Sequence, residues 1–557
     1  MIETMNKIIN KFQNSRKVTL MLALALFVLV NWLNYGFYVR FDLSASGRYR
    51  LTGASKDILR NLPEKVTIEA YFSKDISEAY MQPVKQLRDF LEEYASSSHG
   101  RVHLLFLNPD EDEKIMQKAR SLGIQPMPIG SVDRKKQEVS RVFLSLALYY
   151  EDKTQVIPDI LRQSQALEYF LTANIYKMAH PTERNIGLLE TGGEFATTSG
   201  DNPFHSLEIL DKSMQTFYGN MISVKADAEE ISDNISVLFI VSPHKLTEME
   251  KYHIDQFIMR GGKVILASGG VDINFNNLVA TPKEKDVLEF FSNYGIAIHP
   301  DMVYDSKNYI PFRQPVNMLQ MIEIPYPVWL AIPSESLNQG SLLTKNFKYL
   351  VFPWASSITP DSSKIQDPKI TVLASSSSRS WLKTEGIAIN PEMLKNSLDN
   401  LPPDSEMKPA VLACDIEGKF TSYFAGRKLP AGTKNYVPKS EHPGRIVVVS
   451  TPFAFTNNIQ PVSLAQNMNI NFFLSTLDVM HGLDELVKSR NRIQTENPMI
   501  GPVDMWMKNL MVIFNFMLPL IFISGYAVLR FMTRNRLSKK VYSAMSGAGV
   551  KEGESNA

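Results

Sequence analysis

The sequence has little cysteine and almost no excess of either charge. One cysteine, Cys414, occurs in 557 residues, which excludes an internal disulfide, a Cys-x-x-Cys redox pair and a multi-cysteine zinc site. The 59 basic and 58 acidic residues leave a net charge of +1, so the chain has no general attraction for nucleic acid. We therefore expect neither a disulfide scaffold nor a nucleic-acid-binding protein.

Several catalytic signatures are missing as well. No G-x-x-x-x-G-K-[ST] sequence occurs, so the lysine and hydroxyl with which a P-loop holds phosphate and magnesium are absent. There is no G-x-S-x-G elbow and no H-E-x-x-H helix, and the nine histidines lack ligand spacing. Cys414 falls within a predicted strand, which indicates a buried structural thiol. We expect no catalytic residue, no bound metal and no cofactor.

Two apolar runs without any charge lie near the ends of the chain, at 18–39 and 509–529. At about 1.5 Å per residue, each is long enough to cross a hydrocarbon core of about 30 Å, which predicts two transmembrane helices. By the positive-inside rule, basic residues after the second run place the C-terminus in the cytoplasm. Residues 1–17 and the basic, disordered tail 530–557 are then cytoplasmic, and the body between them is periplasmic in a two-pass protein of the bacterial inner membrane.

Polar residues within the two runs leave alternatives open. Asn31, Asn34 and Asn515 could bond to helices of a membrane partner. The two N-terminal asparagines could equally mark the interfacial end of their helix. A cleaved signal peptide is a second alternative for the first run, although the run exceeds the usual apolar region of about 7 to 15 residues.

The body between the runs reads as α/β throughout. Strands that alternate with helices predict a small α/β domain over 46–160. A second alternating series predicts a doubly wound parallel sheet, which together with a later β-rich portion occupies 161–483. A linker over 484–508 leads to the second apolar run. The predicted fold class is thus a multi-domain α/β body flanked by two transmembrane helices.

Polar loops follow three predicted parallel strands of the second domain, at 185–190, 236–242 and 263–268. The carboxyl ends of parallel strands share one edge of a sheet, so these loops are expected to face one crevice that could hold a polar ligand or a partner. Alternatively, the paired glycines of the first loop only permit a turn. The predicted crevice residues are Glu190, Thr191, Gly192, Gly193, Glu194, Ser242, His244, Ser268, Gly269 and Gly270.

Several segments, taken in their order along the chain, point to one family. They are "GRYRLTGASKDILRNLPEKVTIEAYFS", "LLFLNPDEDE" with "KARSLGI", "ALEYFLTANIYKMAHPTERNIGLLETGGE" and "VLFIVSPHKLTEMEKYHIDQFIMRGGKVILAS". With the last apolar run, they make nearly the whole chain resemble the GldG-like auxiliary proteins of gliding-motility-type ABC transporters. The resemblance implies an accessory subunit that acts beside an ABC permease and a separate ATPase.

The same resemblance bears on the crevice. It implies that the middle domain is similar to amidotransferase-like α/β folds without their catalytic cysteine. Members often carry a histidine in a G-H-G-E-like turn, where this chain has Thr191 to Glu194. We therefore expect a non-catalytic subunit whose body recruits a substrate or partner, or relays ATP-driven motion. The alternatives are an anchored hydrolase or carbohydrate-binding protein that uses the Glu190–Glu194 crevice, and a cleaved, secreted binding protein.

Overall fold

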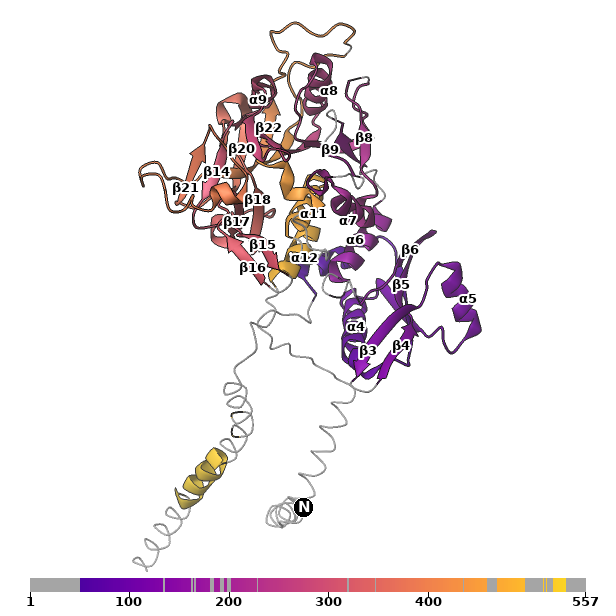
Figure 1. Ribbon diagram of the computed structural model, residues 1–557. Helices are drawn as coiled ribbons and strands as arrows, with labels where there is room; N and C mark the ends of the chain where they lie inside the picture. Colours follow the sequence, from indigo (N-terminus) through magenta and orange to yellow (C-terminus); the bar gives the residue numbers. More distant parts are fainter. Residues whose placement is uncertain are drawn as a thin grey trace, which may run out of the picture. The chain divides into compact units, whose positions relative to one another are not determined.

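The computed structural model describes most of the chain from residue 51 to residue 495, and a helical stretch near its end (Figure 1). The described residues are 51–133, 136–161, 164, 167–180, 185–190, 195–197, 202–227, 229–317, 320–345, 347–433, 435–457, 468–495, 514, 517 and 524–536. The chain divides into two compact units, Met1–Glu496 and Asn497–Ala557. The first unit holds the two sheets described below.

A four-stranded sheet, here the N-terminal sheet, has the strand order β2-β1-β5-β6. β1 and β2 are parallel, whereas β5 is antiparallel to both β1 and β6. A separate hairpin of β3 and β4 precedes β5. The strands are β1 Val66–Phe72, β2 Val102–Leu107, β3 Met127–Asp133, β4 Lys136–Val142, β5 Leu144–Tyr150 and β6 Lys153–Ile157.

Helices cover both faces of the N-terminal sheet, which explains why β1 is buried along almost its whole length although it contains Thr67 and Glu69. The helices α3 (Gly53–Arg60), α4 (Glu78–Ser97) and α6 (Leu167–Ala179) contribute to the core on one face. α5 (Glu113–Ser121) packs on the other face. α3 begins where the side chain of Thr52 accepts a hydrogen bond from Ser55 N, which satisfies one free N–H of the first turn.

A nine-stranded sheet, here the main sheet, has the order β13-β19-β22-β23-β10-β9-β7-β8, with β20 also paired to β22. β10, β9 and β7 are parallel, as predicted, and β23 and β8 at either side of them are parallel to them as well. The strands β22, β19, β13 and β20 form antiparallel pairs, so the sheet is mixed and not wholly parallel. The bounds are β7 Asn185–Leu189, β8 Ile222–Val224, β9 Ile235–Val241, β10 Lys263–Ala267, β13 Ile296–Ile298, β19 Ile358–Pro360, β20 Ile365–Ser375, β22 Val411–Phe420 and β23 Gly444–Val449.

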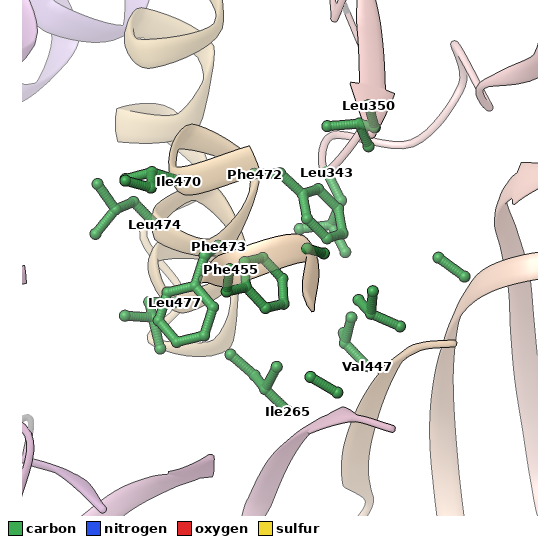
Figure 2. Close-up of a cluster of buried hydrophobic side chains, with 14 of the residues drawn as sticks. Ile265, Leu343, Leu350, Val447, Phe455, Ile470, Phe472, Phe473, Leu474 and Leu477 are labelled. Atoms are coloured by element: carbon green, nitrogen blue, oxygen red, sulfur yellow. The ribbon is translucent and has the colours of Figure 1, made fainter. Parts of the chain in front are cut away.

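Separate hydrophobic cores lie on the two faces of the main sheet. α7 (Glu208–Tyr218), α11 (Met468–Met480) and part of α12 (Asp484–Thr495) contribute to one core. Figure 2 shows Phe473 and Leu477 of α11 in this core, with Ile265 and Val447 of the sheet. α8 (Glu248–Met259) and α9 (Lys285–Ser292) belong to the opposite core. Helices on both faces make the central strands β9 and β10 nearly completely buried.

Short antiparallel hairpins and pairs make up the β-rich portion around the main sheet. The pairs are β11–β12, β14–β21, β15–β16 and β17–β18. Their bounds, with the one-turn helix α10, are β11 Val271–Asn274, β12 Val279–Pro282, β14 Met302–Asp305, β15 Phe312–Asn317, β16 Gln320–Ile324, β17 Trp329–Pro333, β18 Tyr349–Pro353, β21 Ser380–Lys383 and α10 Pro391–Leu394.

The predicted fold class included two transmembrane helices, and this part of the prediction is wrong. Across the residues that the structure describes, no helix combines the length and the apolar character that crossing a bilayer requires. The described helical stretch 524–536 measures about 20 Å and contains three arginines, so it is too short and too polar to cross a bilayer. The run 18–39 with Asn31 and Asn34, and Asn515 in the second run, lie outside the described residues. The structure supports a mixed α/β fold.

Candidate functional site

The carboxyl edge of the parallel strands brings together residues of separate predicted loops. β10, β9 and β7 are neighbours, and Ser268, Ser242 and Glu190 follow them directly. The backbone N–H of Ser242 donates to Ala267 O at 2.9 Å, and that of Ser268 donates to Val449 O at 3.0 Å. These serines therefore continue the hydrogen-bonded ladder one residue beyond the strands.

A lysine that no sequence motif marks lies among these serines. The Nζ atom of Lys283 donates to Ser242 Oγ at 2.9 Å and to Ser268 Oγ at 3.3 Å, although its side chain is 0% exposed. The same Nζ is 3.2 Å from Asp272 Oδ1. Ser242 has a φ of +39°, a strained conformation for a residue with a side chain. The buried ammonium group thus joins the ends of β9 and β10 to the β11–β12 hairpin.

His244 completes the polar cluster toward the solvent. Its Nδ1 lies 3.0 Å from Asp272 Oδ2, and its side chain is 39% exposed. Burial raises the pKa of the Asp272 carboxyl, but the hydrogen bond with His244 and the charge of Lys283 outweigh burial, so the pKa lies below its usual value. We call Ser242, His244, Ser268, Asp272 and Lys283 the edge cluster.

Gly269 and Gly270 allow the chain to pack closely at this edge. A Cβ atom on Gly270 would lie 1.8 Å from the carbonyl oxygen of His299, and one on Gly269 would lie 3.2 Å from that of Ser450. The N–H of Gly270 donates to Ser356 Oγ at 2.7 Å. The two glycines are therefore surrounded by the chain's own backbone, where a ligand had been expected.

Glu190 lies on the same edge but is not among the residues that contact Lys283. Its carboxylate accepts a hydrogen bond from Ser223 and lies 3.9 Å from Lys225 Nζ, and its side chain is 48% exposed. Thr191, Gly192, Gly193 and Glu194 lie outside the described residues. The structure therefore leaves the separation of Glu190 and Glu194 undescribed, and with it the geometry that a glycosidase would need.

Aromatic rings gather beside the edge cluster, a grouping that was not predicted from the sequence. The β11–β12 hairpin that carries Asp272 also carries Phe275, whose ring stacks on Phe204 at a centroid distance of 4.6 Å. Trp354 and Phe453 contact Phe275 edge-on at 5.6 and 5.7 Å. No local sequence pattern predicts this aromatic cluster, because its members come from four separate segments of the chain.

The chemistry of the edge cluster fits a structural role better than a catalytic one. A general base must be able to accept a proton from a bound group, whereas Lys283 is buried and ion-paired with Asp272. Ser242 and Ser268 are 6% and 0% exposed, so a substrate atom has little access to their hydroxyls. Among the described residues, no group of three or more His, Cys, Asp or Glu side chains could hold a metal ion.

Comparison with known proteins defines the class. Residues 183–480, more than half of the chain, match the model of a family described as an ABC-type uncharacterized transport system, whose members are auxiliary components. The chain belongs to this family, and its role is an accessory one in an ABC transport system. This agrees with the expected class of partner and with the expected lack of enzymatic activity. The narrower GldG-like assignment and the predicted domain boundaries stay predictions.

Other similarities add to this picture. Residues 45–149 match a domain of unknown function, DUF7088. An uncharacterized protein of Borreliella burgdorferi is 24% identical over 389 residues, which cover 69% of this chain and 73% of that protein. The crystal structure of a ThuA-like protein from Bacteroides uniformis is 12% identical over 54% of this chain and 91% of its own, with a TM-score of 0.25. A TM-score this low carries no argument about fold or function.

Proposed function

We propose that the chain is a non-catalytic subunit that assembles with an ABC permease and a separate ATPase, and that its body recruits the substrate or partner of that system. The observation that carries the proposal is the family match over 183–480. The edge cluster supports it, because the polar groups at the usual ligand position of an α/β sheet contact one another. A subunit that acts by binding needs no reactive group at this edge.

Purification of the tagged full-length protein from its own host in mild detergent tests the assembly. We expect one ABC ATPase and one multi-span permease to co-purify, and the complex to survive size-exclusion chromatography. A lysate from cells that carry the tag alone is the control. Recovery of the protein as a monomer across several detergents and salt concentrations would contradict the proposal.

A matched substitution distinguishes this function from the hydrolase or carbohydrate-binding alternative. Glu190→Gln removes the charge of an exposed carboxylate and leaves the fold intact, because its partners Ser223 and Lys225 are near the surface. If the chain is a non-catalytic subunit, E190Q should support the same transport phenotype as the wild type. A folded E190Q protein that loses function would favour the hydrolase or carbohydrate-binding alternative. Glu229→Gln is the control, because Glu229 is another exposed acidic residue.

We also propose that the chain belongs to the GldG-like branch and that its body faces the periplasm beside the permease. The ordered segments that resemble GldG-like proteins support the assignment to this branch. Genes for an ABC ATPase and a permease next to the gene for this chain are the expected finding. Protease added to intact spheroplasts should digest the body, whereas protection until lysis would contradict the periplasmic position.

A further inference from the structure

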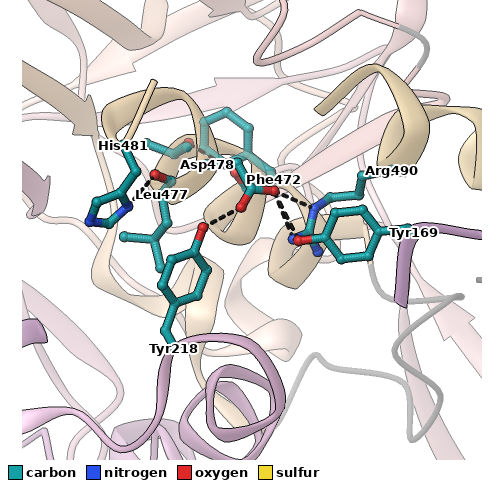
Figure 3. Close-up of polar contacts among 8 residues, drawn as sticks. Tyr169, Tyr218, Phe472, Leu477, Asp478, His481 and Arg490 are labelled. Atoms are coloured by element: carbon teal, nitrogen blue, oxygen red, sulfur yellow. Dashed lines mark hydrogen bonds and ion pairs between the residues drawn. The ribbon is translucent and has the colours of Figure 1, made fainter. Parts of the chain in front are cut away.

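A buried polar node joins four helices of the first unit. Asp478 of α11 accepts hydrogen bonds from Arg490 Nη2 at 2.9 Å and from Arg490 Nε at 3.1 Å. Asp478 also accepts from the hydroxyls of Tyr169 on α6, at 3.0 Å, and Tyr218 on α7. Figure 3 shows the tyrosines and the arginine converging on this one carboxylate. We call these four residues the Asp478 node.

Arg490 holds α12 to both α11 and α6. Its guanidinium carbon lies 3.8 Å from the centroid of the Tyr169 ring, so it makes a cation–π contact as well as the ion pair. The Arg490 and Asp478 side chains are only 1% and 2% exposed. Arg490 of α12 therefore makes a charged, directional contact with α6.

α6 is shared by the two halves of the unit. Its residues Leu171 and Ile175 belong to the core under the N-terminal sheet, while Phe170 and Ala173 belong to a core of the main sheet. Hydrogen bonds also tie α6 to elements of the N-terminal half: Glu168 accepts from Thr52 N at 2.7 Å, and Thr172 is 2.9 Å from the hydroxyl of Tyr94. A change in the position of α6 must therefore affect both cores.

The energetics of the node favour a positioning role. Apolar residues of similar volume are often as stabilising as a buried ion pair, because burial of two charges is costly. What the ion pair adds is geometry, since its hydrogen bonds are made in one arrangement only. An ion pair of this kind suits a junction between helices that is either closed or open. An apolar contact in its place would allow the helices to slide against each other.

We propose that the Asp478 node is a latch that couples α12 to both halves of the body through α6. When Arg490 is seated, the N-terminal sheet and the main sheet move as one body. α12 also lies against α3. When Arg490 leaves Asp478, α12 detaches from α6 and α3, and the N-terminal sheet reorients relative to the main sheet. This inference concerns the chain itself and does not depend on the identity of its transport partners.

Hydrogen exchange on the full-length protein tests the release of α12. In Arg490→Met, we expect amides of α12, α3 and α6 to exchange at least about tenfold faster, while those of β9 and β10 stay as protected as in the wild type. Lys488→Met is the matched control, because Lys488 lies on the same helix and pairs with Glu485 at the surface. Unchanged exchange in α12 of R490M would overturn the proposal, and so would an equal increase in β9 and β10.

Spin-label distances test the reorientation. Met81→Cys on α4 and Met393→Cys on α10 place labels on the two halves, and both native side chains are exposed, at 54% and 69%. With R490M we expect a broadened distance distribution, and with K488M an unchanged one. If R490M fails to fold, Tyr218→Phe replaces it in the experiment, because this change removes only the hydrogen bond of the Tyr218 hydroxyl to Asp478. We expect a smaller broadening of the distance distribution in Y218F. A distribution as narrow as the wild type in both R490M and Y218F would overturn the latch.

Discussion

The ammonium group of Lys283 lies 2.9 Å from the hydroxyl of Ser242, although 41 residues separate them in the chain. Lys283 follows the β11–β12 hairpin, and Ser242 follows the central strand β9. The contact therefore fastens a peripheral hairpin to the centre of the main sheet. Since Asp272 supplies the counter-charge, the lysine is buried without an unpaired charge.

Removal of this ammonium group should destabilise the fold. In Lys283→Met, the largely buried carboxylate of Asp272 loses the ammonium group as its ion partner. Loss of one partner of a buried ion pair typically lowers the free energy of unfolding by about 3 to 5 kcal/mol. We expect the free energy of urea unfolding to fall by roughly that amount. Lys285→Met is the control, because its side chain is 88% exposed and the change should stay within about 0.5 kcal/mol. A K283M protein as stable as K285M would show that the edge cluster is not structural.

Acid should weaken the same cluster. The pKa of Asp272 is lower in the folded protein than in the unfolded chain, where it is about 3.9. Its contribution to stability is therefore complete above the unfolded value and is lost as the pH falls through the folded value. Asp272→Asn should cost most at neutral pH and progressively less in urea unfolding below about pH 4.

The control for this pH dependence is Asp233→Asn. Asp233 pairs with Arg260 at 3.4 Å, but its side chain is 91% exposed. Exposed ion pairs contribute little, so D233N should unfold like the wild type at every pH. A cost for D272N that stayed constant from neutral to acid conditions would contradict the assignment of Asp272 as the titrating group.

The sequence predicted the part of the site that depends on strand order. Apolar runs such as that of β9 indicate buried strands, and parallel strands must share a carboxyl edge, so Ser242 and Ser268 were expected to lie together. Lys283 could not be predicted in this way. It enters the edge through tertiary packing of a later hairpin, and lysines are almost never fully buried unless paired.

The antiparallel direction of strands in the main sheet was not predicted, for a similar reason. β22 pairs with both β23 and β20, and its burial pattern resembles that of a central parallel strand. Strand direction is set by the connections, here residues 376–410 between β20 and β22 and 421–443 between β22 and β23, and these connections carry no periodic signal. The two membrane spans were predicted from the hydrophobicity of the sequence alone, and among the described residues no helix is long and apolar enough to cross a bilayer.

Close packing at Gly270 gives a third prediction. Gly270→Ala would bring a Cβ to 1.8 Å from the His299 carbonyl, so the backbone must shift, and we expect a loss of several kcal/mol in unfolding free energy. Gly53→Ala is the matched control: no atom lies within 4 Å of its added Cβ, and it sits in α3. It should be neutral or stabilising by up to about 1 kcal/mol. A tolerated G270A would indicate that the carboxyl edge has room for a ligand after all.

The single thiol offers a direct test of the central core. Cys414 of β22 is 0% exposed, as its position in a predicted strand indicated, and burial raises the pKa of its thiol to about 12. Both lack of access and lack of thiolate protect it from electrophiles at neutral pH. We expect a thiol reagent such as 5,5′-dithiobis(2-nitrobenzoate) to leave the native protein unmodified and to react completely in urea. The exposed thiol of Met393→Cys should react within seconds to minutes in the native protein and so confirm that the reagent is active. Rapid modification of Cys414 without denaturant would mean that the main sheet opens locally at β22, contrary to the burial of both of its faces.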